Sequence, residues 1–302
     1  MIKNVCFINN YNNEKYLAEC LNSVFSQTLS FDQVIIVDDG STDRSVDVIS
    51  EFLLKYPNLL LKQKNNEGQI STFNFVASSL PDLSQIFFLD GDDIYPLDYL
   101  ELATDLLGTQ GWDFAFCEKY EFSDAEPQIL DTSLMQNLPT QVIHSSSALA
   151  RSRKCWIGNV TSTLSISARL FKQIFPYPGY LDKPLFVDDL INYASSILGV
   201  TKVYLPSLRV GWRSHEANIS KRAYTSEDII NRDIAIERLF NWFCMKYKIP
   251  RYPNLGEFFE EYHSLGAEWQ IKLDLPNKFR IVNRLIRDLT KQSFIKILNA
   301  VR

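Results

Sequence analysis

Short apolar runs alternate with helix-like stretches over the first hundred residues of the chain. Four runs have the composition of buried strands: Val5–Ile8, Gln33–Val37, Leu59–Leu61 and Gln85–Leu89. Between them, apolar residues recur at helical spacing within residues 17–25, 46–53 and 70–80. This alternation predicts β-α-β units and a mostly parallel sheet. Helices cover both faces of such a sheet, which explains why the runs are continuously apolar.

Polar residues directly follow three of these runs. They are Asn10-Tyr11, Asp38-Asp39 and the segment from Asp90 to Asp93. In open sheets of this kind, ligands bind beyond the carboxyl ends of the strands. Because three polar loops are expected at one edge of the sheet, the sequence predicts a ligand site there.

Composition and charge narrow the class of protein. Of the 302 residues, 46% are hydrophobic and 22% are charged, as in soluble globular proteins. The net charge of -5 argues against general nucleic-acid binding, which needs a basic surface. The five cysteines are scattered without a C-x-x-C pair, so we expect neither a zinc site nor a disulfide framework, and a cytoplasmic location. We also expect no signal peptide and no transmembrane helix, because no apolar stretch reaches about 18 residues.

The motifs of three common enzyme classes are absent. No G-x-G-x-x-G follows the first apolar run, which argues against a dinucleotide-binding fold of the usual kind. No G-x-x-x-x-G-K-[ST] and no G-x-S-x-G occur, which excludes P-loop enzymes and serine hydrolases with a nucleophile elbow.

The acidic cluster Asp90-Gly91-Asp92-Asp93 has two interpretations. Carboxylates at alternate positions just past a strand can approach one hard divalent cation, which often also binds substrate phosphates. Such a cation would neutralise charge on a diphosphate leaving group. Alternatively, the cluster is an acidic turn before a helix that begins near Pro96. Taken alone, the cluster favours neither interpretation.

Read in series, the loops resemble the opening of family-two inverting glycosyltransferases. The matching segments are Ile8–Leu17, Ser26–Thr28, Ile36–Asp43, Asn65–Gln69 and Phe88–Asp93. The resemblance is dense over residues 2–103 and sparser to about residue 221. It implies a GT-A fold: a Rossmann-like, mostly parallel central sheet flanked by helices. Residues 1–103 would form the nucleotide-binding half, residues 104–221 the acceptor-binding half, and residues 222–302 a helical C-terminal extension.

The same resemblance implies a set of donor-binding residues. Tyr11 would stack on the base, Asp39 would hydrogen-bond the base or ribose, and Asp38 would support their loop. The other donor-site positions are Gly68 and Gln69, at the start of the next helical stretch, and Asp90 and Gly91, with Asp90 near the ribose. Without the resemblance, a partly buried core tyrosine and a helix-capping aspartate would be the simpler interpretations of Tyr11 and Asp39. By family habit, the donor would be a UDP-sugar.

The resemblance also assigns the metal and the base. Asp92 would coordinate Mn²⁺ or Mg²⁺ with help from Asp93, and His215 would approach the metal or the donor phosphate. Arg213 would bind phosphate. An inverting transferase needs a general base, and the pair Asp188-Asp189 matches the family's position, with Asp189 as the base. The alternatives are that this pair favours a helix N-terminus electrostatically and that His215 is a surface histidine.

The C-terminal segment 278–302 contains seven basic residues and one acid, with apolar residues at roughly helical spacing. A basic amphipathic helix of this kind either contacts a membrane surface or packs on the domain with a solvated basic face. Membrane contact would have a purpose, because many acceptors of such enzymes are lipid-linked. It would place the protein peripherally on the inner face of the cell membrane.

These observations predict a metal-dependent inverting glycosyltransferase of cell-surface polysaccharide biosynthesis. It would move a sugar from a nucleoside-diphosphate donor to a glycan or glycolipid acceptor. The alternative from another class is a non-catalytic scaffold of a glycan-assembly complex. A nucleotidyltransferase would begin with a glycine-rich basic loop, which Asn9–Asn13 is not. The sequence identifies neither the sugar, nor the acceptor, nor the linkage.

Overall fold

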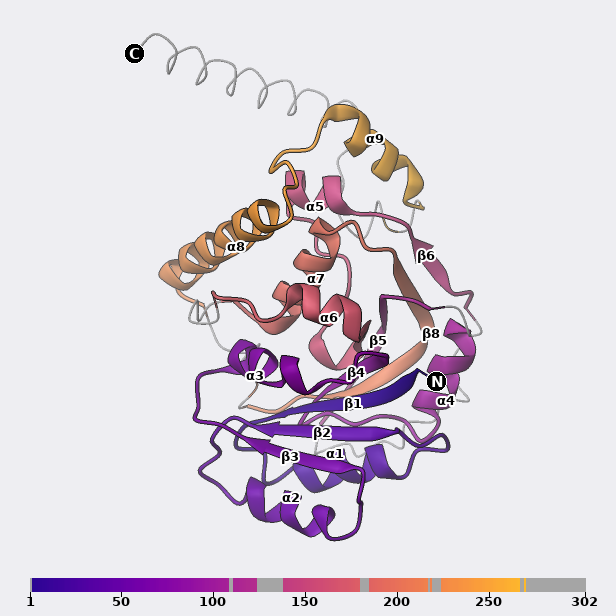
Figure 1. The fold of residues 1–302 in the computed structure, drawn as a ribbon, viewed down its shortest axis with the longest axis vertical. Helices are drawn as coiled ribbons and strands as arrows, with labels where there is room; N and C mark the ends of the chain where they lie inside the picture. Colours follow the sequence, from indigo (N-terminus) through magenta and orange to yellow (C-terminus); the bar gives the residue numbers. More distant parts are fainter. Residues whose placement is uncertain are drawn as a thin grey trace.

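A single eight-stranded sheet forms the centre of the protein, with the order β3-β2-β1-β4-β7-β5-β8-β6. In the computed structural model, the described residues are 2–108, 111–123, 138–179, 185–216, 218, 224–266 and 269. Figure 1 shows α1 and α2 on one side of the sheet and α3, α6 and α7 on the other. The predicted α/β architecture with a mostly parallel sheet and flanking helices is confirmed.

The first ninety residues form the parallel part of the sheet. Its strands are β1 (Lys3–Asn10), β2 (Gln33–Asp38), β3 (Leu59–Gln63) and β4 (Ser84–Asp90). These four strands pair with one another in parallel. The connections contain α1 (Leu17–Phe25), α2 (Ser45–Leu53), α3 (Gln69–Val76) and the 3-10 turn η1 (Ala77–Ser79). All four strands expected from the apolar runs are present.

The second part of the chain adds mixed strand directions. Its elements are α4 (Tyr99–Leu107), β5 (Phe114–Phe122), β6 (Gln141–Ile143), α5 (Ser147–Arg153), η3 (Thr161–Thr163), β7 (Leu164–Ser167), α6 (Ala168–Ile174), α7 (Val187–Ile197) and β8 (Lys202–Arg213). The short strand β7 is antiparallel to both β4 and β5. As a consequence β5 and β8, which pair in parallel, run in the same direction as β4. The carboxyl ends of β4, β5 and β8 therefore lie at the same edge of the sheet.

Two hydrophobic cores cover the two faces of the sheet. Along β1, Val5 and Phe7 belong to one core, whereas Cys6 and Ile8 belong to the other. Successive side chains of a strand point to opposite faces, so a strand buried on both faces has to be apolar at every position. This is the physical origin of the continuous apolar runs in the sequence.

The described part of the C-terminal region packs into one of these cores. Helix α8 (Ser226–Lys246) contributes Leu239 and Phe240, and α9 (Leu255–Ser264) contributes Phe258. The Glu261 carboxylate of α9 accepts hydrogen bonds from Ser145 Oγ at 2.6 Å and Leu149 N at 3.0 Å. A helical C-terminal region is thus present, and its described part shares a core with the sheet. The boundary at residue 221 stays a prediction.

Two predictions concern membranes. Among the helices of the described ranges, none is long and apolar enough to cross a membrane. The basic segment 278–302 lies outside the described residues, and its contact with a membrane surface stays a prediction.

Candidate active site

The polar ends of β1, β2 and β4 lie side by side. In the strand register, Asn10 is opposite Asp38 and Asn9 is opposite Asp90. The order β2-β1-β4 therefore brings the three loops predicted to converge to the same edge of the sheet. The strand order and register are therefore enough to bring Asn10, Asp38 and Asp90 close together.

Asp38 organises the first two loops. Its buried carboxylate accepts hydrogen bonds from Asn10 Nδ2 at 2.8 Å and from the Ser41 backbone N–H at 2.9 Å. Beside it, the Tyr11 side chain is 43% exposed at the loop surface. An exposed ring on a fixed loop is available for stacking on a planar ligand.

Asp39 holds the segment that leads into α3. It accepts hydrogen bonds from the Glu67 and Gly68 backbone N–H groups at 3.1 and 2.9 Å, and it forms an ion pair with Lys64. Gly68 adopts a φ of +91°, a conformation that favours glycine. The structure therefore shows Asp39 as the anchor of this segment, and its contact with a base or ribose stays a prediction.

Asp90 lies at the end of β4 among several polar groups. Its Oδ1 accepts hydrogen bonds from Gln69 Nε2 at 3.0 Å and from Asn9 Nδ2 at 3.4 Å. Burial and the carboxylates of Asp92 and Asp188 raise the pKa of Asp90 to about 7, against the effect of these hydrogen bonds. Gln69, predicted as a donor-site residue, thus orients Asp90.

Gly91 is a position of close packing. A Cβ atom there would lie 2.6 Å from Asn10 Oδ1, inside normal contact distance. This close approach brings the β4 loop against the β1 loop and explains why a side chain is absent.

Asp92 and His215 face one another. Asp92 Oδ2 lies 2.9 Å from His215 Nε2, and the two side chains are 17% and 13% exposed. The imidazole packs on the Tyr16 ring, with centroids 4.8 Å apart. A carboxylate oxygen and an imidazole nitrogen at this separation suit a cation such as Mn²⁺. In the part of the chain that the structure describes, no group of three or more His, Cys, Asp or Glu side chains could hold a metal, so substrate oxygens would have to complete the shell.

Asp93 lies beneath this loop with both oxygens hydrogen-bonded. Oδ2 accepts from Ser162 Oγ at 2.5 Å, and Oδ1 accepts from the Arg213 backbone N–H at 2.8 Å. Burial and the neighbouring Asp92 and Asp90 raise the pKa of Asp93 well above its usual value. These contacts fix the loop, and coordination of a metal by Asp93 stays a prediction.

Arg213 also stabilises this loop from below. Its Nε donates to the Asp92 carbonyl oxygen at 2.9 Å, and the guanidinium forms an ion pair with Glu19. The guanidinium lies 4.7 and 4.4 Å from the ring centroids of Tyr16 and Phe122. Arg213 is 3% exposed, so the structure shows it as a support of the Asp92 loop, and phosphate binding by Arg213 stays a prediction.

The two carboxylates predicted to include the general base, Asp188 and Asp189, lie in the first turn of α7. Asp188 Oδ1 accepts the Asp189 N–H at 2.9 Å, and burial with the Asp189 charge raises the pKa of Asp188 to about 7. The charge of Asp188 also contributes to the raised pKa of Asp90 at the end of β4. Asp189 is 3% exposed, and its two oxygens lie 2.8 and 2.9 Å from Arg232 Nη2.

Comparison with known proteins decides the family. The family model described as glycosyl transferase family 2 matches residues 6–175, which is more than half of the chain. The chain belongs to glycosyl transferase family 2. The predicted family and its glycosyltransferase class are thereby confirmed.

Individual relatives agree with this assignment. The chain is 28% identical over 235 residues to an uncharacterized glycosyltransferase of Nostoc sp., covering 76% of this chain and 71% of that protein. It is 36% identical over 86 residues to the minor teichoic acid biosynthesis protein GgaB of Bacillus subtilis, covering 28% of this chain and 10% of that protein. The solved structure of S. aureus TarS 1-349 in complex with UDP-GlcNAc has a TM-score of 0.61, with 18% identity, 92% of this chain and 78% of that chain covered. The shared fold is GT-A, as predicted.

The match of the family 2 model ends before several candidate residues. Asp188, Asp189 and His215 lie beyond residue 175, as does Arg232. Arg232 is absent from the residues predicted from the sequence, because no motif surrounds it. The only sign of Arg232 in the sequence is its spacing. It lies three residues before Ala235 and four before Ile236, both buried, and therefore on the inward face of α8.

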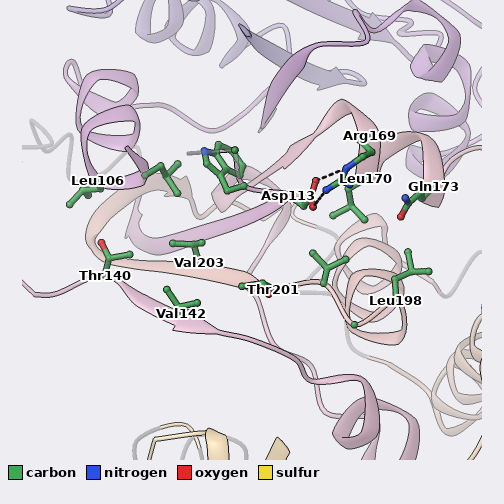
Figure 2. Close-up of a pocket in the computed structure, with 15 residues that line it drawn as sticks. Leu106, Asp113, Thr140, Val142, Arg169, Leu170, Gln173, Leu198, Thr201 and Val203 are labelled. Carbon is green, nitrogen blue, oxygen red and sulfur yellow. Dashed lines mark hydrogen bonds and ion pairs between the residues drawn. The ribbon is translucent and has the colours of Figure 1, made fainter. Parts of the chain in front are cut away.

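A cavity of about 630 Å³ in this family 2 enzyme lies at the opposite end of the sheet (Figure 2). Its walls include Trp112, Leu170 and Val203, and an ion pair between Asp113 and Arg169 lies at its edge. It is lined by the amino ends of β5 and β8 and by the C-terminal end of α7, whereas the candidate residues lie at the carboxyl ends of the strands. None of the residues predicted for donor, metal or base lines this cavity.

Ser162 is the second contributor that the motifs did not predict. Its hydroxyl accepts the Asp90 backbone N–H at 3.0 Å and donates to Asp93, so one side chain of η3 bridges both ends of the acidic loop. We expect Ser162→Ala to lower the free energy of unfolding by about 1–3 kcal/mol, because it leaves buried polar groups without a partner. Urea unfolding measures this change.

The matched control for Ser162 is the exposed serine of α2. Ser50 Oγ donates to the Val46 carbonyl at 2.8 Å within that helix, away from the acidic loop. Ser50→Ala is expected to change stability by less than about 0.5 kcal/mol. Equal losses in the two variants would show that the Ser162 bridge does not stabilise the loop.

Proposed function

We propose that this enzyme transfers a sugar from a nucleoside-diphosphate donor, with a UDP-sugar favoured, to a glycan or glycolipid acceptor with inversion at the anomeric carbon. The observation that carries the proposal is the pair of Asp92 and His215 beside Asp90, at the carboxyl end of β4. The complex of TarS with UDP-GlcNAc supports a UDP-sugar as the donor.

The nucleotide would occupy the edge formed by the first three loops. The exposed Tyr11 ring would stack on the base, and Asp39 and Asp90 would accept hydrogen bonds from base or ribose groups. The close packing of Gly91 on Asn10 would hold the β1 and β4 loops together at this edge. These roles follow the resemblance to family 2, and the 43% exposure of the Tyr11 side chain supports the first of them.

The leaving group would lie over Asp92. A divalent cation held by Asp92 Oδ2 and His215 Nε2 would neutralise charge on the departing diphosphate. The chain's own part is to fix these two atoms, through Arg213 on the Asp92 carbonyl and Tyr16 against the imidazole. Asp93 would assist by holding the loop in place.

The acceptor would enter between the β4 loop and the start of α7. Its hydroxyl oxygen bonds to the anomeric carbon while the bond to the diphosphate breaks, and its proton passes to Asp189. Asp188 would remain beside the base and maintain a high local proton affinity. The match to GgaB supports an acceptor of cell-surface polymer synthesis, and peripheral contact with the membrane stays part of this proposal.

Donor binding with and without metal tests the proposal. Isothermal titration with UDP-, GDP-, CMP- and dTDP-sugars should show tightest binding for one UDP-sugar and a requirement for Mn²⁺. Asp92→Asn is expected to lower Mn²⁺-dependent transfer by roughly 100-fold or more, since loss of one group at the developing charge costs about 10²–10³-fold.

The matched control for Asp92 is the exposed carboxylate of α2. Asp47→Asn changes one charge away from the acidic loop and should leave turnover unchanged. Full turnover by Asp92→Asn would refute the metal site. Absence of binding to every donor would favour the non-catalytic scaffold.

A further inference from the structure

The closest contact between the C-terminal region and the proposed base is the ion pair of Arg232 with Asp189. One guanidinium nitrogen, Nη2, lies 2.8 and 2.9 Å from the two carboxylate oxygens of Asp189. The same carboxylate also accepts the Phe186 backbone N–H at 3.3 Å. These contacts fix the orientation of the carboxylate from two sides.

The position of Arg232 is itself set by the core. One turn further along α8, Ala235 and Ile236 enter the hydrophobic core, and Leu239 and Phe240 follow them. The guanidinium lies 5.3 Å from the Phe186 ring centroid, and the Arg232 side chain is 36% exposed. The charged group is therefore held beside Asp189 by a packed helix while part of it stays in solvent.

Asp189 needs a cation because its surroundings oppose its charge. The titratable and charged groups around this pair come from α7, α8 and the strand edge: Asp188, Tyr193, Arg232, Asp233, Tyr224 and Asp90. Burial raises the pKa of Asp189, and Arg232 acts in the opposite direction. Removing the cation would leave a buried carboxylate beside a second one, an arrangement that favours the protonated acid.

We propose that Arg232 is the positioning residue for the base: it keeps Asp189 ionised and orients the carboxylate toward the acceptor hydroxyl. This inference rests on the proposed function, which makes Asp189 the base. During transfer, the hydroxyl proton moves to an Asp189 oxygen, the hydroxyl oxygen bonds to the anomeric carbon, and the diphosphate leaves with the electron pair. Arg232 gives up no proton and stays cationic throughout.

The pH profile of transfer tests this role. In Arg232→Gln, the pKa of Asp189 rises, so the acid limb of the kcat profile moves to higher pH by about 1–3 units, the range expected for loss of an adjacent opposite charge. Arg232→Lys keeps the charge but loses the planar guanidinium, and a smaller shift is expected. A structural residue without this role would lower activity or stability at all pH values and leave the limb in place.

A second readout does not depend on turnover. Urea unfolding of Arg232→Gln, with and without Asp189→Asn, is followed from pH 4 to 8. With its folded pKa raised, Asp189 binds its proton more tightly in the folded chain. Stability then falls as pH rises from the unfolded pKa of about 3.9 to the raised folded value. Asp189→Asn should remove this slope, and the pKa obtained should exceed that of Asp189 in the wild-type chain.

The matched control is a second ion pair of α8. Arg251 pairs with Glu237 at 2.8 Å, away from Asp189, so Arg251→Gln should leave the acid limb and the Asp189 titration unchanged. The same Asp189 pKa in wild type and Arg232→Gln would overturn the inference. If the wild type transfers no sugar from any donor, the proposed function fails, and the unfolding experiment still decides whether Arg232 holds Asp189 ionised.

Discussion

Asp189→Asn is expected to lower kcat by about 10²–10⁴-fold, the usual contribution of a general base. Asparagine preserves the volume of the side chain but cannot take up the acceptor proton. Asp189 lies on α7, apart from the nucleotide loops of β1 and β2, so KM for the donor should change little. Steady-state rates at saturating donor and metal, measured across pH, test this.

A helix-capping role is the alternative for Asp189, and the chain offers a matched control for it. Asp189 Oδ2 accepts the Phe186 N–H at the start of α7, and Asp228 Oδ2 accepts the Thr225 N–H at 3.0 Å at the start of α8. Asp228→Asn removes the same kind of cap without touching the base. If the two variants retained similar activity, Asp189 would be a capping residue and not the base.

Gly158→Ala is expected to prevent stable folding. A Cβ atom at Gly158 would lie 1.6 Å from Asn192 Oδ1, and the glycine adopts a φ of +150°. Asn192 has little freedom to move, because it is fully buried and its Nδ2 donates to the Asn159 carbonyl at 3.0 Å. We expect a loss of more than about 4 kcal/mol, in the range of severe core disruption. Urea unfolding, or the soluble yield if no folded protein remains, measures it.

A second glycine separates steric overlap from backbone strain. Gly108 also has a positive φ, +67°, but no atom lies within 4 Å of its Cβ position. Gly108→Ala should therefore cost only the strain of a backbone conformation that is essentially restricted to glycine, φ 67° with ψ -172°, about 1–3 kcal/mol. If Gly158→Ala cost no more than Gly108→Ala, Asn192 would not be fixed as the structure shows.

The parallel half of the fold was predictable because burial on both faces leaves a direct trace in the sequence. The segments Val5–Ile8, Val34–Val37 and Ile86–Leu89 are apolar at every position, and the residues after them are polar. Since parallel strands place their carboxyl ends together, the gathering of Asn10, Asp38 and Asp90 followed from the pattern. The direction of β7 did not, because a four-residue strand has no periodicity that distinguishes its pairing partner.

The contacts that position the acidic and basic groups were less predictable. Ser162 meets Asp93 across 69 residues, and Arg232 meets Asp189 across 43. Such contacts depend on the path of the chain through η3 and on the packing of α8, which local spacing does not encode. The resemblance to family 2 predicts phosphate binding by Arg213 but not its contact with the Asp92 carbonyl, which supports the Asp92 loop.

The division of the site at residue 175 has an evolutionary consequence. The acids proposed to bind donor and metal lie within the segment that the family 2 model matches, whereas the proposed base and its arginine lie on α7 and α8, beyond that segment. A descendant could lose Asp189 or Arg232 and retain every residue by which the family is recognised. Membership of family 2 therefore does not by itself guarantee the proposed base, and a pseudoenzyme of this kind would be recognised by substitutions on α7 and α8.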